Sequence, residues 1–338
     1  DLQRYFFRRL NEGLSSLGRT KGVGIAIDPR NGEVLALVSL PSFDNNRVAD
    51  YLEARGEPLF NRAIAGLYPP GSTIKPLVAL AALRERIITP AFRIFSSGVL
   101  EVPNPYNPEE PSRFLDWRPH GWVDLAAALA RSSNNYFYGI TGGLPRETYA
   151  YGEFPQPLGI VRLRAYWEQF LLGRELGIDL PGEAQGFLPD HKEKEERTGQ
   201  PWRLGDTYNV AIGQGDLLVT PLQLVNFIAS VGNNGRIMRP HVVRGTETSK
   251  TLFDYSRWTE ELSAVQKDMN DAVVASYGTA HLLSSLPMAA AGKPGSAQVA
   301  NNTRVNAFFV GYMPAENPAI ALLVLIENAR EGSLNAVP

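Results

Sequence analysis

Residues 22–40 read GVGIAIDPRNGEVLALVSL, two apolar runs with a polar turn between them. The runs Gly22–Asp28 and Glu33–Leu40 are typical of β-strands, and the Asp-Pro-Arg-Asn-Gly stretch from residue 28 to residue 32 favours a tight turn. A connection this short joins antiparallel strands, because parallel strands need a crossover of about a dozen residues or more. The sequence therefore predicts a β-hairpin near the N-terminus and argues against a βαβ unit.

The C-terminal end of the chain has the same character. Three strand-like runs, Met288–Ala300, Val305–Met313 and Ala319–Glu327, are separated by short polar turns. Together with the hairpin they give five strands, which can form one antiparallel sheet. We therefore expect the two ends of the chain, about 1–65 and 235–338, to build the sheet part of an α+β fold.

The middle of the chain, about 66–234, is predicted to be mostly helical, as an all-helical subdomain beside the sheet. Apolar residues recur at helical spacing in 1–17, Ser72–Arg86, Val123–Arg131, Val161–Leu176 and Pro221–Asn233. The proline-rich segment 102–119 is expected to be a surface loop. The charged run 192–197 is expected to be a solvated loop or helix end.

The composition excludes several classes of function. The chain has 338 residues, a net charge of -2, no Cys and 4 His. A balanced charge argues against nucleic acid as a partner, because such proteins need a basic surface. The absence of Cys excludes thiolate nucleophiles, iron–sulfur clusters and Cys-ligated zinc. The longest apolar run, Ala319–Ile326, is too short to span a membrane.

No common metal or nucleotide motif is present, and neither a metal nor an organic cofactor is expected. The sequence has no Walker loop, no G-x-S-x-G elbow and no H-E-x-x-H pair. Asp116, His120 and Asp124 could be imagined as metal ligands. Without Cys or a second nearby His, a turn with a solvent-facing His120 is the favoured interpretation.

One pair of residues has the chemistry of a nucleophile and its base. Ser72 and Lys75 are three residues apart where a turn enters a predicted helix, so they share one helix face. A serine hydroxyl is a poor nucleophile until a base takes its proton, and a desolvated lysine can do this where arginine cannot. Lysine is also scarce, with 7 Lys among 33 basic residues.

Two further stretches follow the pair in an informative order. Ser132 and Asn134 form Ser-x-Asn after a predicted helix, and Lys293 and Gly295 begin a predicted strand. The order S-x-x-K, S-x-N, K-x-G resembles the signature of penicillin-binding proteins and serine β-lactamases. The surrounding sequence is most similar to the class B transpeptidases, especially the elongation-type penicillin-binding protein 2 group. The matching stretches are 26–29, 31–39, 68–76, 177–183, 211–215, 220–223 and 311–315.

The resemblance implies a role for each motif residue. It makes Ser72 the acylated nucleophile and Lys75 its base. It makes Ser132 the proton shuttle to the leaving amine, and it gives Asn134 the task of holding the substrate amide and Lys75. Lys293 would attract the substrate carboxylate and help to keep Lys75 neutral.

The resemblance also implies an oxyanion hole made by the backbone N–H groups of Ser72 and Ser296. Each donor of such a hole is commonly worth ~3 kcal/mol. Gly295 would let the substrate approach the strand closely, and the Ser296 hydroxyl would also bind the carboxylate.

One departure from the family pattern concerns Pro294, which stands where the family has Thr or Ser. Proline has neither the hydroxyl nor a backbone N–H, although an edge strand tolerates it. Loss of one such contact costs ~1.5–3 kcal/mol, or roughly 10- to 100-fold. We expect β-lactams to acylate this chain more slowly than a Pro294→Thr variant, unless Ser296 takes over the role.

The implied function is a peptidoglycan D,D-transpeptidase that cross-links stem peptides and is acylated by β-lactam antibiotics. The alternatives are a β-lactamase or D,D-carboxypeptidase on the same fold, and an impaired scaffold of the wall-synthesis complex. The resemblance implies a membrane glycosyltransferase of the elongation complex as partner. It also implies a location at the periplasmic face of the cytoplasmic membrane. Since the family's membrane anchor, pedestal domain and C-terminal helix have no counterpart here, we expect an excised transpeptidase domain.

Overall fold

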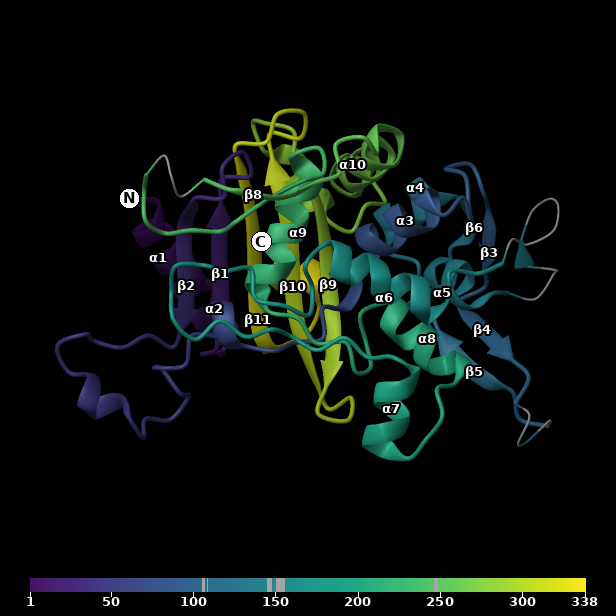
Figure 1. The fold of residues 1–338 in the computed structure, drawn as a ribbon, viewed down its shortest axis with the longest axis horizontal. Helices are drawn as coiled ribbons and strands as arrows, with labels where there is room; N and C mark the ends of the chain where they lie inside the picture. Colours follow the sequence, from purple (N-terminus) through teal and green to yellow (C-terminus); the bar gives the residue numbers. More distant parts are fainter. Residues whose placement is uncertain (105–106, 108, 145–147, 150–155, 246–248) are drawn as a thin grey trace.

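A five-stranded antiparallel sheet joins the two ends of the chain, in the order β2-β1-β11-β10-β9. The strands are β1 (Gly22–Ile27), β2 (Val34–Leu40), β9 (Ala291–Val299), β10 (Arg304–Met313) and β11 (Ile320–Ala329). β1 pairs with β2 through the predicted hairpin and with β11 on its other side. The predicted α+β fold with a five-stranded antiparallel sheet is therefore confirmed (Figure 1).

The computed structural model describes residues 1–338 except 105–106, 108, 145–147, 150–155 and 246–248. Its helices are α1 (Leu2–Ser16), α2 (Arg62–Ala65), α3 (Lys75–Arg84), α4 (Leu125–Arg131), α5 (Asn134–Gly142), α6 (Gly159–Gln169), α7 (His191–Thr198), α8 (Leu204–Ala211), α9 (Pro221–Gly232), α10 (Thr259–Val274) and α11 (Gly332–Asn335). Short 3₁₀ turns include η1 (Val48–Tyr51), η2 (Gly71–Ile74) and η4 (His281–Ser285). Among the described ranges, no helix has the length and apolar character needed to cross a bilayer.

Helix α9 forms the centre of the core. Thr220 caps it by accepting from the backbone N–H of Gln223, whose side chain reaches back to the Thr220 N–H, and Pro221 occupies the first turn. Every residue of α9 is buried, including the polar Gln223, Asn226 and Ser230. It packs on β1, β10 and β11, so it covers the centre of one face of the sheet.

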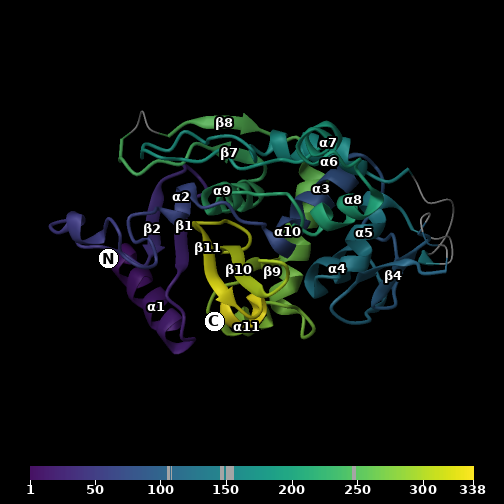
Figure 2. The same cartoon turned by 90° about the horizontal axis from the view of Figure 1, so that it is seen from below.

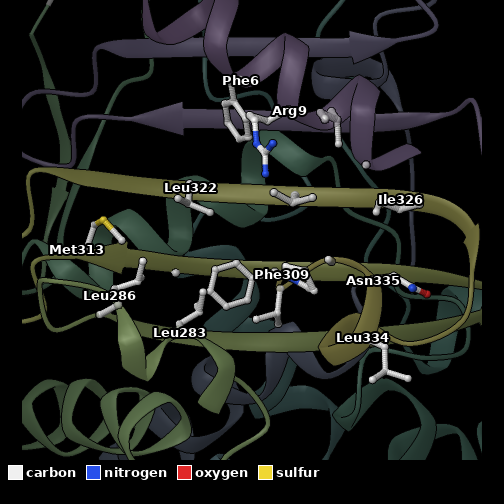
Figure 3. A pocket seen from close by; sticks show the side chains of 18 of the residues that line it. Phe6, Arg9, Leu283, Leu286, Phe309, Met313, Leu322, Ile326, Leu334 and Asn335 are labelled. Carbon is white, nitrogen blue, oxygen red and sulfur yellow. The ribbon is translucent and has the colours of Figure 1, made fainter. Parts of the chain in front are cut away.

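The opposite face of the sheet is covered only at its margins by the helices in the described ranges. α1 packs on β1 and β2, and α11 packs on β9 and β10 (Figure 2). Between them lies an apolar groove of about 620 Å³, floored by Phe309, Leu322 and Val324 (Figure 3). Arg9 of α1 reaches over this groove.

The region between the two halves of the sheet is not all helical, which corrects the prediction. It contains two-stranded sheets formed by β3 (Ile94–Ser96) with β6 (Gly121–Val123) and by β4 (Val99–Val102) with β5 (Ser112–Leu115). Another, β7 (Arg236–Met238) with β8 (Thr251–Asp254), follows α9. These strands have three or four residues each, too few for a clear alternating pattern.

Three local predictions also need correction. The segment 102–119 is not wholly a loop, because β5 lies within it, while Pro105 and Pro108 lie outside the described residues. The helix expected at 161–176 is α6, which ends at Gln169. The charged run 192–197 lies within the regular helix α7, where Lys194 pairs with Asp206.

Candidate active site

The Ser72–Lys75 pair lies where the 3₁₀ turn η2 runs directly into helix α3. Gly71, which precedes Ser72, has φ +56, a conformation that favours glycine. A Cβ on Gly71 would lie 2.6 Å from the carbonyl oxygen of Ser296, so the turn is pressed against β9. Ser72 is partly exposed, whereas Lys75 is completely buried. An accessible hydroxyl is therefore placed one helical turn from a desolvated amine.

The Lys75 amine is held by the Ser-x-Asn loop. Lys75 Nζ donates to the Ser132 carbonyl oxygen at 2.8 Å and to Asn134 Oδ1 at 2.7 Å, and it lies 3.3 Å from Ser132 Oγ. Burial lowers the pKa of Lys75 to about 7, and the charge of Asp116 opposes part of this shift. A substantial fraction of Lys75 is then neutral near pH 7. A neutral amine can keep two donated hydrogen bonds and still accept a proton from a serine hydroxyl.

The loop that carries Ser132 has a constrained backbone. Ser132 ends α4 in the left-handed conformation, with φ +59, and Ser133 begins α5 by accepting from the Tyr136 N–H. A non-glycine residue in this conformation persists only where its surroundings hold it. The Asn134 amide adds a donated hydrogen bond to the Leu115 carbonyl at 3.1 Å. The loop is therefore fixed on both sides of the Lys75 amine.

Asp116 is the buried anchor of this loop. Its Oδ2 accepts from Ser133 Oγ at 2.7 Å, from Ser96 Oγ at 3.1 Å and from the Asn135 N–H at 3.1 Å. Burial alone would raise the pKa of Asp116, but the contact with His120, the charge of Lys75 and these hydrogen bonds outweigh it and lower the pKa.

The expectation of a solvent-facing His120 was wrong. The His120 and Asp116 side chains are both fully buried, with His120 Nε2 3.5 Å from Asp116 Oδ1. The Asp116 carboxylate accepts from Ser96 Oγ, and the His120 backbone N–H donates to the Ser96 carbonyl, so both residues are held against the end of β3. Across the described residues, no group of three or more His, Cys, Asp or Glu side chains could hold a metal ion.

Strand β9 brings Lys293, Gly295 and Ser296 to the other side of Ser72. Lys293 is completely buried, and its Nζ donates to the carbonyl of the neighbouring Pro294 at 2.9 Å. Burial, followed by repulsion from Lys75, lowers the pKa of Lys293 well below its usual value. A Cβ on Gly295 would lie 2.7 Å from Thr73 Cγ2, so glycine is required for this strand to approach the catalytic turn.

The Ser296 backbone and side chain have partners that the motif did not indicate. Ser296 Oγ accepts from the N–H of Gly332 in α11 at 3.0 Å, and the Ser296 carbonyl accepts from Gln214 Nε2 at 3.3 Å. Gly332 lies so close to β9 that a Cβ would be 2.2 Å from the Gly295 carbonyl oxygen. Helix α11, near the C-terminal end, therefore packs closely against β9 and holds Ser296 in place.

Of the site residues predicted from the sequence, some are hydrogen-bonded to one another, and others lie nearby without a hydrogen bond between them. Lys75 is hydrogen-bonded to Ser132 and Asn134. Lys293 makes no such contact with Lys75, but it lies close enough for the charge of Lys75 to lower the pKa of Lys293. Within the described part of the chain, the Ser72 hydroxyl makes no hydrogen bond to a side chain.

Sequence reasoning missed the parts played by Asp116, Gln214 and Gly332. The sequence suggests Asp116 only as a metal ligand, through its spacing to His120. Gln214 lies in a stretch shared with the class B family, but no local pattern links it to a strand more than 80 residues away. All three contacts are made by tertiary folding.

Comparisons with known proteins agree with this site and fold. The model of the penicillin binding protein transpeptidase domain matches residues 22–337. The peptidoglycan D,D-transpeptidase MrdA of Haemophilus influenzae is 34% identical, with 100% of this chain and 53% of that protein aligned. The Acinetobacter baumannii protein of the same name is 33% identical, over 94% of this chain and 49% of that protein. The chain thus spans about half the length of these relatives.

Solved structures give the same result. The Pseudomonas aeruginosa PBP2 in complex with WCK 5153 has a TM-score of 0.80 at 34% identity, covering 98% of this chain and 74% of that one. The Helicobacter pylori PBP2 in complex with MreC has a TM-score of 0.80 at 28% identity, covering 98% and 62%. With the family model matched over nearly its whole length, the chain belongs to the family of penicillin-binding protein transpeptidase domains.

Proposed function

We propose that this chain is the transpeptidase domain of an elongation-type peptidoglycan D,D-transpeptidase that works through an acyl-Ser72 intermediate. The observation that carries the proposal is the buried Lys75 amine, with a pKa of about 7, one helical turn from the partly exposed Ser72. An amine in this state is a base matched to neutral pH.

In the first half-reaction, Ser72 Oγ attacks the carbonyl carbon between the two terminal D-Ala residues while its proton passes to Lys75. The backbone N–H groups of Ser72 and Ser296 stabilise the oxyanion. The C–N bond then breaks, and the leaving D-Ala amine takes a proton that reaches it from Lys75 through Ser132. Lys293 pairs with the terminal carboxylate of the donor peptide.

In the second half-reaction, an amine from a neighbouring stem peptide attacks the Ser72 ester. Its proton returns through Ser132 and Lys75, the ester C–O bond breaks, and the Ser72 hydroxyl is restored as the new amide forms. Asn134 holds both the substrate amide and Lys75. Gly295 lets β9 lie close to the catalytic turn, because a Cβ there would meet Thr73.

The proposal extends to partners and location. β-Lactams would acylate Ser72 and remain as esters. A membrane glycosyltransferase of the elongation complex is the proposed partner, and the periplasmic face of the cytoplasmic membrane is the proposed location. A solved relative is described as a complex with MreC, and another as part of a peptidoglycan synthase complex.

A fluorescent penicillin tests the acyl-serine step directly. We expect one adduct per chain by intact mass, mapped to the peptide that contains Ser72 and absent from Ser72→Ala. Release of D-alanine from a stem pentapeptide only when an amine acceptor is present would support transpeptidation. Rapid nitrocefin turnover would instead support a β-lactamase, and a folded protein that takes no label would support a scaffold.

A further inference from the structure

The small sheet of β3 and β6 presents aromatic rings to solvent. Ile94 and Val123 point into the core, while Phe95 and Trp122 lie opposite each other on the outer face, 5.5 Å apart between ring centroids. They are 42% and 43% exposed. A half-buried antiparallel sheet normally places polar residues outward, so folding alone does not explain this pair.

Arginines accompany the exposed tryptophans of this region. The Arg93 guanidinium lies 5.8 Å from the ring centroid of Trp122, and the Arg118 guanidinium lies 4.4 Å from that of Trp117, which is 54% exposed. Within the described residues, neither arginine forms an ion pair. We refer to Arg93, Phe95, Trp117, Arg118 and Trp122 as the Arg–Trp patch.

One member of the patch, Trp117, lies beside the candidate active site. Trp117 follows the anchor Asp116, and its indole N–H donates to the carbonyl of Arg131, the residue before Ser132, at 3.1 Å. This hydrogen bond fixes an exposed ring beside the catalytic loop. β3 and β6 lie at the far end of the molecule from α1 (Figure 1). The patch therefore has Trp117 beside the catalytic loop and Phe95 and Trp122 on the small sheet farther from α1.

We propose that the Arg–Trp patch binds a glycan strand of the wall polymer while one of its stem peptides occupies the site at Ser72. This inference rests on the proposed function. Sugar rings present apolar C–H faces that stack on exposed aromatic rings, and the carboxylates of stem peptides complement unpaired guanidinium groups. Because Trp117 is hydrogen-bonded to the residue before Ser132, an occupant of the patch that reaches Trp117 also reaches the edge of the catalytic loop. Its rings and cations suit a polar polymer better than an apolar protein surface.

Co-sedimentation with purified peptidoglycan sacculi tests the proposal. In a Ser72→Ala background, which prevents turnover, the double variant Arg93→Gln/Trp122→Ala should bind sacculi about 10-fold more weakly than its parent. Glycan strands stripped of stem peptides by an amidase provide the second probe. Binding to them should still depend on Trp122, because stacking needs only sugar rings.

The chain offers a matched control on α1. Tyr5 is 54% exposed and carries Arg8 at 5.7 Å from its ring centroid, at the other end of the molecule. Tyr5→Ala/Arg8→Gln should bind sacculi like the parent. Equal binding by patch variant and parent, or an equal loss in the control, overturns the proposal. If Trp122→Ala lowers the melting temperature, Arg93→Gln alone is the variant to compare, with a loss of about 3-fold expected.

Penicillin labelling separates this proposal from the proposed function. A small penicillin carries no sugar, so wild-type labelling at Ser72 reports on the chemistry and not on the patch. If wild type takes no label but binds sacculi through Trp122, the proposed function fails and the patch stands. If wild type is labelled but the patch variants bind sacculi as well as their parent, the proposed function stands and the glycan-binding proposal fails.

Discussion

The two buried lysines of the site, Lys75 in α3 and Lys293 in β9, have the same side chain in different surroundings. Lys75 Nζ has three oxygens within 3.3 Å, all from the loop that Asp116 anchors. Lys293 Nζ, among the described residues, has only the carbonyl of the adjacent Pro294. The helical region therefore holds its amine ready as a base, while the strand holds an amine without a counter-ion. A bound carboxylate would restore the charge of Lys293, so the substrate completes the strand side of the site.

The largest expected effect comes from removing the base on the helical side. Lys75→Arg should lower the rate constant of β-lactam acylation more than about 1000-fold, because a guanidinium does not accept a proton near neutral pH. Stopped-flow acylation with a reporter cephalosporin measures this. Lys267→Arg, an exposed change in α10, is the matched control and should have no effect. A Lys75→Arg rate within 10-fold of wild type would remove the proposed role of Lys75.

The next effect tests the anchor of the helical side. In wild type the acylation rate should fall as the pH drops through about 7, because Lys75 then holds its proton. Asp116→Asn removes the negative charge that raises the pKa of Lys75 and a strong acceptor for Ser133. We expect acylation about 30-fold slower at its pH optimum and an acid limb displaced to lower pH. Rates between pH 5 and 9 decide this. An acid limb of the pH–rate profile displaced to higher pH would contradict this prediction. Asp44→Asn, a change at an exposed residue, is the control and should leave the profile unchanged.

Helix α10 bridges the two regions, since it packs on both α4 and β9. It buries Asp268, whose Oδ2 has no hydrogen-bond partner among the described residues. Burial raises the pKa of Asp268 to about 7, while the charge of Lys267 opposes this shift. The pKa of Asp268 is higher in the folded than in the unfolded protein. Protonation of Asp268 therefore contributes its full stabilisation of the folded state below about pH 4, and this contribution is lost as the pH rises through 7.

Asp268→Asn should therefore raise the free energy of unfolding by about 2 kcal/mol at pH 8 and by much less at pH 5. Urea unfolding at the two pH values measures the difference. Glu260→Gln, an exposed change on the same helix, should show no such pH dependence. Equal gains at pH 5 and 8 would show that the Asp268 carboxylate carries no unfavourable charge in the folded protein.

The sequence predicted the strand side of the molecule better than the helical side. Residues 22–40 and 288–327 are apolar runs separated by short turns, and those turns predict the pairing of β1 with β2, of β9 with β10 and of β10 with β11. The helix expected at 161–176 was too long, because Phe170, Leu171 and Leu172 are buried after α6 ends and imitate its periodicity. Within the site, the order of motifs revealed Ser72 and Lys75, whereas Asp116 acts through contacts with residues 17 or more positions away.

The smallest effect concerns the strand side, where Pro294 interrupts the family motif. Pairing of β9 with β10 runs through Pro294 without a register shift, and β9 is the edge strand, so the missing N–H leaves the sheet intact. Ser296 Oγ accepts from Gly332 but keeps its own proton to donate. A second hydroxyl should therefore add one contact to a ligand carboxylate. We expect Pro294→Thr to acylate about 10-fold faster than wild type, which corresponds to ~1.4 kcal/mol.

Pro294→Val separates the hydroxyl from the other changes, because valine has the shape of threonine and also restores the backbone N–H. If the hydroxyl is responsible, Val should acylate at close to the wild-type rate. If Thr and Val gain equally, the restored N–H or the loss of the proline ring is responsible. Equal rates for wild type and Pro294→Thr would mean that Ser296 already supplies the contact. In that case the strand side already has its hydroxyl, and the substrate carboxylate supplies only the partner that Lys293 lacks among the described residues.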